Sequence, residues 1–275
     1  MTGPLISLLS DFGARDPSAA IMRGVVLGIA PDARIVDISH EVRKFAIRDG
    51  ALLLWCALPY LPVGFHVAVV DPGVGTARLP IAIATGRGDV LVGPDNGLLV
   101  GAAERLGGVA AAHVLEAAPY RLPVISTSFH GRDIFAPAAA HLANGVPLAA
   151  FGPAVLPAAL VPSPIREPRV EAGRLSSSVV YVDTFGNVKL AGLRADLEAA
   201  LGPVRPADGL ALSVSGGATI RTTWQATFGE VAPGESLVYE DSYGRICLAA
   251  SQADAAAKHG LVEDLEVVVE RANPD

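Results

Sequence analysis

Short apolar runs alternate with longer amphipathic or alanine-rich stretches over the first 150 residues. The runs that we interpret as strands are residues 5–9, 34–38, 65–70, 81–84 and 90–92. The stretches that we interpret as helices are residues 18–29, 47–58, 97–106 and 133–143. Strands that alternate with helices typically form a parallel sheet covered by helices. We therefore expect residues 1–160 to form an α/β domain with a mostly parallel sheet.

The pattern changes after residue 155, where several prolines punctuate the chain and indicate a linker. Beyond it, short strand-like runs are separated by turns containing Gly, Asp or Pro. These runs are residues 177–182, 210–214, 219–223, 236–239, 245–249 and 265–269. Such spacing is typical of a small barrel. We expect residues 170–275 to form a smaller, antiparallel β-barrel domain.

Charge and composition narrow the range of partners. The chain has 275 residues, a net charge of -7 and no basic run, which disfavours nucleic acid and anionic membranes as partners. No apolar stretch reaches the roughly 18 residues of a membrane span. The first residues lack signal-peptide features, and the two cysteines, Cys56 and Cys247, lie far apart. We expect a cytoplasmic protein that acts on a small molecule.

Two polar clusters, residues 71–78 and 129–133, interrupt the apolar pattern and contain Asp71, Arg78 and His130. Asp71 follows an apolar run, so we expect it at the carboxyl end of a buried strand, where α/β sheets bind ligands. A carboxylate, a guanidinium and an imidazole are together suited to activating water. Taken singly, Asp71 with Arg78 is more typical of a structural ion pair, and His130 is more typical of a hydrogen-bonded core histidine.

Asp11 follows the first predicted strand and is suited either to binding a vicinal diol or to forming a turn. The chain lacks the glycine-rich phosphate-binding motifs of dinucleotide-binding proteins and P-loop enzymes. His130, Asp133 and His141 are a candidate metal set, but they lack a recognised ligand spacing. We therefore expect no metal.

Three further segments, residues 93–97, 183–187 and 241–245, combine polar side chains with glycine. The last two also contain an aromatic residue and a carboxylate, which suits a heteroaromatic ligand with charged attachments. Each segment alone is also typical of a hairpin or tight turn.

Five motifs taken together resemble the S-adenosyl-L-methionine (SAM) hydrolases. These enzymes are also called SAM hydroxide adenosyltransferases and are related to the fluorinases and chlorinases. The motifs occur in the family's order and extend across nearly the whole chain. They are Ser10-Asp11-Phe12-Gly13, Asp71-Pro72-Gly73-Val74-Gly75-Thr76 with Arg78, Gly93-Pro94-Asp95-Asn96-Gly97, Phe129-His130-Gly131-Arg132-Asp133 and Asp183-Thr184-Phe185-Gly186-Asn187.

The resemblance implies an N-terminal α/β domain, a C-terminal β-barrel domain and a homotrimer with active sites at the subunit interfaces. It implies hydrolysis of SAM to adenosine and L-methionine, with attack at the ribose C5′ and no cofactor. The catalytic residues that it implies are Asp71, Arg78 and His130. The substrate-binding residues that it implies are Asp11 for the ribose diol, Asp183 for the methionine ammonium, Ser242 for its carboxylate, Phe185 and Asn187 for adenine, and also Asn96 and Ser251.

Two other functions stay open: a SAM-dependent halogenase, and a protein that binds SAM or adenosine without catalysis. The halide-using relatives lack the Asp and His of the triad, and the Asp71 carboxylate would repel a halide. A short turn at residues 86–89 replaces the long insertion of the fluorinases. The chain also departs from the family pattern at Asp16-Pro17-Ser18 and at residues 188–191, which bear on the substrate contacts.

Overall fold

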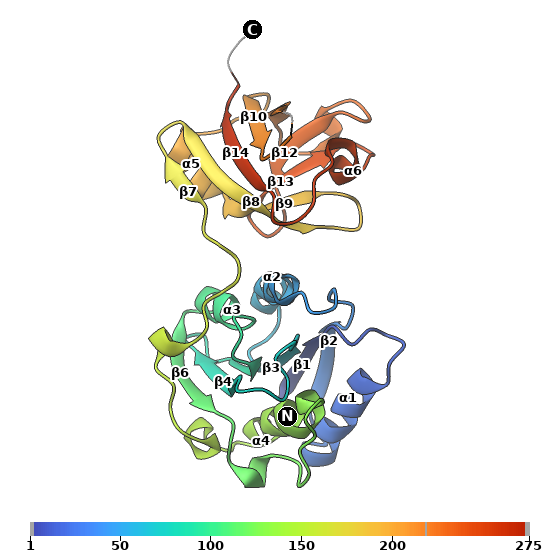
Figure 1. The fold of residues 1–275 in the computed structure, drawn as a ribbon, viewed down its shortest axis with the longest axis vertical. Helices are drawn as coiled ribbons and strands as arrows, with labels where there is room; N and C mark the ends of the chain where they lie inside the picture. Colours follow the sequence, from blue (N-terminus) through green and yellow to red (C-terminus); the bar gives the residue numbers. More distant parts are fainter. Residues whose placement is uncertain (1–2, 218, 273–275) are drawn as a thin grey trace. The chain divides into compact units, whose positions relative to one another are not determined.

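The computed structural model describes residues 3–217 and 219–272 and divides into two compact units, Met1–Pro164 and Ile165–Asp275 (Figure 1). The first unit is a mixed α/β domain and the second is a β-barrel, which confirms the predicted fold class. Within the described residues, no helix has both the length and the apolar character needed to cross a membrane.

The N-terminal sheet has six strands in the order β2-β1-β3-β5-β4-β6. They are β1 (Leu5–Ser10), β2 (Arg34–Ser39), β3 (Phe65–Val69), β4 (Pro80–Thr85), β5 (Val90–Pro94) and β6 (Val109–Val114). Strands β2, β1, β3 and β5 pair in parallel, whereas β4 is antiparallel to both β5 and β6. The sheet is therefore mostly parallel, as predicted.

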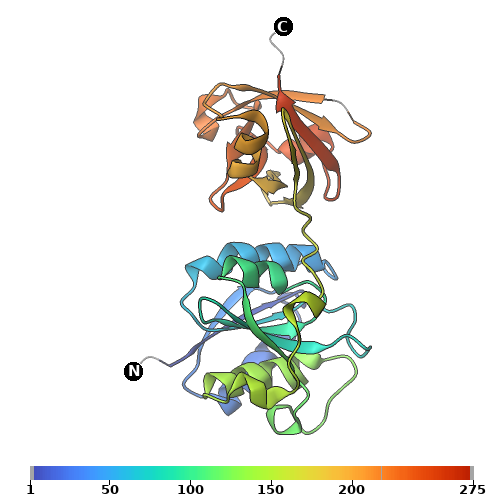
Figure 2. The same cartoon turned by 90° about the vertical axis from the view of Figure 1, so that its left-hand side faces the viewer.

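Two helices cover each face of this sheet (Figure 2). Helices α1 (Ser18–Ile29) and α4 (Ala136–Ala143) pack together on one face, and α2 (Ile47–Ala57) and α3 (Val100–Arg105) on the other. Alternate β1 side chains supply the two cores, because successive residues of a strand point to opposite faces. Leu8 packs on the α1 side and Leu9 on the α2 side, and both are fully buried.

In the second unit, the described residues form eight strands, of which seven close into a barrel. They are β7 (Arg169–Glu171), β8 (Arg174–Val182), β9 (Val188–Leu193), β10 (Gly209–Val214), β11 (Thr219–Trp224), β12 (Ser236–Glu240), β13 (Arg245–Ala250) and β14 (Glu266–Arg271). Strand β14 pairs with both β10 and β8, which closes the ring, while β7 adds to the outer edge of β8. The barrel differs from the predicted antiparallel pattern at one place, because β11 and β12 pair in parallel.

Shorter helical segments complete the chain. Helices α5 (Arg194–Leu201) and α6 (Ala255–His259) belong to the barrel unit. A π-helical turn, Gly131–Phe135, leads directly into α4. Single 3₁₀ turns occur at Leu58–Tyr60, Ala118–Tyr120, Leu148–Phe151, Pro157–Ala159 and Phe228–Glu230.

Candidate active site

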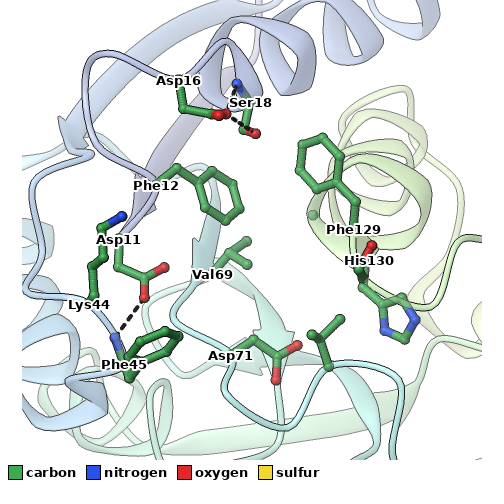
Figure 3. A pocket seen from close by; sticks show the side chains of 13 residues that line it. Asp11, Phe12, Asp16, Ser18, Lys44, Phe45, Val69, Asp71, Phe129 and His130 are labelled. Carbon is green, nitrogen blue, oxygen red and sulfur yellow. Dashed lines mark hydrogen bonds between the residues drawn. The ribbon is translucent and has the colours of Figure 1, made fainter.

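The carboxyl ends of β1 and β3 meet at one edge of the N-terminal sheet and form the floor of a cavity. The two strands pair in parallel with Ser10 opposite Val69, so Asp11 and Asp71 follow neighbouring strand ends. The cavity measures about 430 Å³ (Figure 3). It is lined by Asp11, Phe12, Asp16, Ser18, Lys44, Phe45, Val69, Asp71, Val74, Ser128, Phe129, His130 and Gly131.

Arg78 is in direct contact with both Asp71 and His130. The Arg78 guanidinium donates from Nε to Asp71 Oδ1 at 3.1 Å and from Nη2 to the other carboxylate oxygen. The same Nη2 lies 3.1 Å from His130 Nδ1. The Asp71 and Arg78 side chains are only 4% and 7% exposed, so water screens this ion pair weakly. The structure thus brings together the three residues predicted to activate water.

The contact with Arg78 defines the proton position on His130. A guanidinium has only donors, so Nδ1 of His130 must accept and the ring proton must lie on Nε2. Burial lowers the pKa of His130 and the Arg78 charge lowers it further, while the Asp71 carboxylate acts in the opposite direction. The imidazole is therefore neutral at pH 7 and retains an Nε2–H donor on a residue that lines the cavity.

The loop of residues 71–78 packs closely against the segment that precedes His130, and Gly75 lies at the point of closest approach. Gly75 has φ +76°, and a Cβ at this position would lie 2.4 Å from the Thr127 carbonyl oxygen. Only glycine allows both the conformation and this close approach. The two loops therefore pack backbone to backbone, which places Arg78 beside His130.

Asp133 stabilises the same segment rather than facing a metal site. Its carboxylate accepts from the Ser126 backbone N–H at 2.8 Å and from Arg132 Nε at 2.6 Å. Burial raises the pKa of Asp133, but these hydrogen bonds outweigh it and hold the pKa below its usual value. His141 packs against the Tyr120 ring at 5.3 Å. In the ranges 3–217 and 219–272, no three His, Cys, Asp or Glu residues are grouped as metal ligands.

Asp11 has one carboxylate oxygen already engaged. Its Oδ2 accepts from the Phe45 backbone N–H at 2.9 Å, which leaves Oδ1 without a hydrogen bond to the described protein groups (Figure 3). Phe45 has φ +66°, an unusual conformation for a bulky residue, and it is 71% exposed. The hydrogen bond to Asp11 helps to hold this residue at the cavity rim.

Several cavity residues were not predicted as site residues, among them Asp16, Ser18, Lys44 and Phe45. Lys44 and Phe45 lie in the loop after β2, and no local motif marks them. Asp16 and Ser18 do carry a signal: the carboxylate accepts from the Ser18 backbone N–H at 2.8 Å and from its hydroxyl. This short-range pattern is typical of a helix start, here that of α1, and it also lowers the pKa of Asp16.

Asn96, a predicted substrate-binding residue, is not among the residues that line the cavity. Its Nδ2 donates to the Val70 carbonyl at 2.9 Å, and its Oδ1 accepts from the Leu98 backbone N–H at 3.2 Å. Asn96 thus ties the turn before α3 to the residue that follows β3, next to Asp71.

The barrel unit has a separate pocket of about 690 Å³. Four of the predicted substrate-binding residues line it, namely Asp183, Phe185, Asn187 and Ser242. Its other lining residues are Lys189, Phe228, Tyr239, Asp241, Tyr243, Ala250, Gln252 and Ala253. Ser251, the remaining predicted residue, is buried and is not among them.

Hydrogen bonds fix the polar wall of this pocket. Asp183 accepts from the backbone N–H groups of Phe185 and Asn187 at 2.9 and 3.0 Å, and from Asn187 Nδ2 at 2.9 Å. Lys189 forms a buried ion pair with Asp241, and its ammonium lies 5.3 Å from the centre of the Tyr243 ring. Phe185 is 77% exposed, so a large apolar ring borders the pocket in contact with solvent.

Comparisons with known proteins match both units. Residues 6–152 match the model of the SAM hydroxide adenosyltransferase N-terminal domain, and residues 177–268 match that of the C-terminal domain. An "(R)-S-adenosyl-L-methionine hydrolase" from Salinispora tropica is 46% identical over 92% of each chain. A protein of the same name from Thermus thermophilus is 39% identical over 95% of this chain and 98% of its own.

More distant relatives and solved structures extend the comparison. A fluorinase from Actinoplanes sp. is 28% identical over 98% of each chain. The crystal structure of an uncharacterized conserved protein from Thermotoga maritima superposes with a TM-score of 0.89 at 34% identity. It covers 97% of this chain and all of that one.

Proposed function

We propose, because the chain belongs to the SAM hydroxide adenosyltransferase family, that the protein is an enzyme that hydrolyses SAM to adenosine and L-methionine. The observation that carries this proposal is the contact of Asp71, Arg78 and His130 at a cavity formed by the ends of β1 and β3. A protein that only bound SAM would not need a guanidinium that contacts both a carboxylate and an imidazole.

In the proposed reaction, water attacks C5′ of the ribose while the bond from C5′ to sulfur breaks. The electron pair of that bond moves to the positive sulfur, so methionine leaves as a neutral thioether and needs no general acid. The charge on sulfur disappears as the reaction proceeds, and a dry pocket favours such a step.

The three polar residues have different tasks in this reaction. His130, protonated on Nε2, donates a hydrogen bond to the attacking oxygen and cannot take its proton. The Asp71 carboxylate retains lone pairs and accepts the proton as the bond from oxygen to C5′ forms, when that oxygen becomes acidic. Arg78 holds Asp71 and His130 in place and balances the carboxylate charge. No metal or cofactor enters this scheme.

Halogenation is the less suitable reaction for this cavity. Three of its lining residues, Asp11, Asp16 and Asp71, are acidic, against one basic residue, Lys44. Such a lining attracts the sulfonium cation of SAM and repels a halide anion. The fluorinase relatives are also less similar to this chain than the hydrolases, at 28% against 46% identity.

We assign the substrate groups to the two pockets as follows. Asp11 Oδ1 binds the ribose diol, and Phe185 with Asn187 contacts adenine. Ser242 binds the methionine carboxylate, and Asp183 binds its ammonium through the single lone pair that its three hydrogen bonds leave. Asn96 and Ser251 belong to the proposed set as supports, since neither is among the residues that line these two pockets.

We also propose a homotrimer in which subunit interfaces complete the active sites. The support is that Phe45 and Phe185, one in each pocket, are largely exposed in the single chain. Exposed aromatic rings at a polar site are typical of surfaces that a partner or ligand covers. A cytoplasmic location is part of the proposal, because both cysteines are buried free thiols, which suits a reducing compartment.

The test is chromatography of SAM incubated with chelator-treated protein, with and without chloride or fluoride. Both sulfonium epimers are used, because the relatives are named for the (R) form, and we propose that form as the substrate. Adenosine and methionine in every salt condition support the hydrolase. A halide-dependent nucleoside indicates a halogenase, and unchanged SAM refutes catalysis.

A further inference from the structure

A chain of hydrogen-bonded side chains lies behind the strand end that carries Asp11. Ser10 Oγ lies 2.7 Å from His40 Nδ1, and His40 Nε2 lies 3.1 Å from Asp37 Oδ1. Arg23 pairs with both oxygens of Asp37. We propose that Ser10 and His40 are positioning residues that orient Asp11 and Phe12 toward the nucleoside. This inference rests on the proposed function, in which Asp11 binds the ribose diol.

In this hydrogen-bonded series of side chains, the chemistry of each group determines which atoms donate and which accept. The Arg23 guanidinium can only donate. Burial raises the pKa of Asp37, but the hydrogen bonds from Arg23 and His40 outweigh burial and keep this pKa below its usual value. His40 Nε2 therefore donates to the ionised Asp37, which leaves Nδ1 as an acceptor for the Ser10 hydroxyl. Ser10 Oγ in turn accepts from the Phe12 backbone N–H at 3.4 Å. Each group is thus either a donor or an acceptor at a given atom, so this series of hydrogen bonds specifies one arrangement of the side chains.

Backbone contacts of the same residues fix both sides of Asp11. The His40 carbonyl accepts from the Gly13 N–H at 2.7 Å, and the Ser10 carbonyl accepts from the Val42 N–H at 3.3 Å. Asp11 itself accepts from Phe45 N–H. Three hydrogen bonds thus join the loop after β1 to the loop after β2. One precedes Asp11 in the sequence, one is made by Asp11 and one follows it.

Ser10 and His40 act through their neighbours and not on the substrate. Ser10 is fully buried, the His40 side chain is 9% exposed, and neither is among the residues that line the cavity. Their pairing also differs from that of a serine hydrolase, where the carboxylate contacts Nδ1 and the serine contacts Nε2. A nucleophilic Ser10 is therefore excluded by both access and geometry.

The same strand offers a matched control. Ser7 Oγ lies 2.7 Å from His66 Nδ1, and His66 Nε2 lies 3.0 Å from Asp89 Oδ1. These three residues are fully buried and do not line the cavity. Ser7→Ala removes the same kind of hydrogen bond from β1 as Ser10→Ala, but at a place that does not support Asp11.

The experiment measures kcat and KM for SAM, and Kd for adenosine by calorimetry, in wild type, Ser10→Ala and Ser7→Ala. Ser10→Ala should raise KM and Kd roughly two- to tenfold, the range of one lost neutral hydrogen bond, with kcat nearly unchanged. Ser7→Ala should lower the thermal midpoint but leave KM and Kd at their wild-type values.

His40→Ala, measured alone and in an Asp11→Ala background, provides a second and independent test. If His40 acts through Asp11, the increase in adenosine Kd becomes smaller when Asp11 is absent, and only the part that acts through Phe12 is left. Equal effects of Ser10→Ala and Ser7→Ala on Kd, or an undiminished His40 effect without Asp11, overturn the positioning role. Absence of SAM turnover in wild type refutes the proposed function instead, and the adenosine Kd values still distinguish the two outcomes.

Discussion

Replacing Gly75 with alanine should separate the loop of residues 71–78 from the segment that carries His130. The new Cβ would lie 2.4 Å from the Thr127 carbonyl oxygen, whereas ordinary contacts begin at 3.4 Å, so the loops must move apart by about 1 Å. The distance from Arg78 Nη2 to His130 Nδ1, now 3.1 Å, would then exceed that of a hydrogen bond.

We expect two measurable effects of Gly75→Ala. A displacement of about 1 Å in a catalytic group costs on the order of a hundredfold in rate, so kcat for SAM should fall by about that factor. The φ of +76° adds roughly 1–2 kcal/mol of backbone strain, which urea denaturation should report as a lower free energy of unfolding. Steady-state assays and urea titrations together separate the two effects.

Gly73→Ala is the control within the same loop. Gly73 does not have a positive φ, and its Cβ would meet no atom closer than 3.5 Å. We expect a change in unfolding free energy within about 0.5 kcal/mol and wild-type kcat. Wild-type kcat in Gly75→Ala, or an equal loss in both variants, would refute the idea that this close contact assembles the site.

Further predictions concern the polar groups of the site. Asp71→Ala and His130→Ala should abolish turnover but keep SAM binding, as measured by calorimetry. Asp71→Ala should also lower the free energy of unfolding by about 3–5 kcal/mol, because the buried Arg78 loses its ion-pair partner. Asp11→Ala and Asp183→Ala should instead raise the Kd for SAM with a smaller effect on kcat. Burial and Arg78 lower the pKa of His130, and only the neutral ring accepts from Arg78. As the pH falls, kcat/KM should therefore decline with a midpoint below the usual pKa of histidine. A midpoint at or above that usual value would contradict this. Chelator treatment should leave the rate unchanged, and a loss that zinc restores would revive the metal alternative.

The hydrophobic pattern predicted most elements of the parallel sheet because buried strands are short, apolar and bounded by turns. It failed at β6, where residues 110–113, three alanines and a histidine, include no β-branched residue. The helix predicted from residue 97 begins at Val100, because Asn96 accepts from the Leu98 N–H and prolongs the turn. Helix α5 was also missed, since its eight residues lie between strands without a proline or glycine at the start.

The site was predictable in its residue types but not in its contacts. Asp71 and Arg78 lie in one loop, and their pairing follows from the glycines between them. The contact of Arg78 with His130, 52 residues away, depends on the backbone approach of Gly75 to Thr127, which no local pattern reveals. The link between Ser10 and His40 is of the same kind, because parallel strand ends bring it together across 30 residues.

The central claim is that water attacks C5′ of SAM, and incubation in ¹⁸O-labelled water tests it most directly. Mass spectrometry of the products should find one ¹⁸O atom in adenosine and none in methionine, with no label in a His130→Ala control because turnover is lost. Methylthioadenosine, a halogenated nucleoside, or adenosine without the label would contradict the proposed attack on C5′.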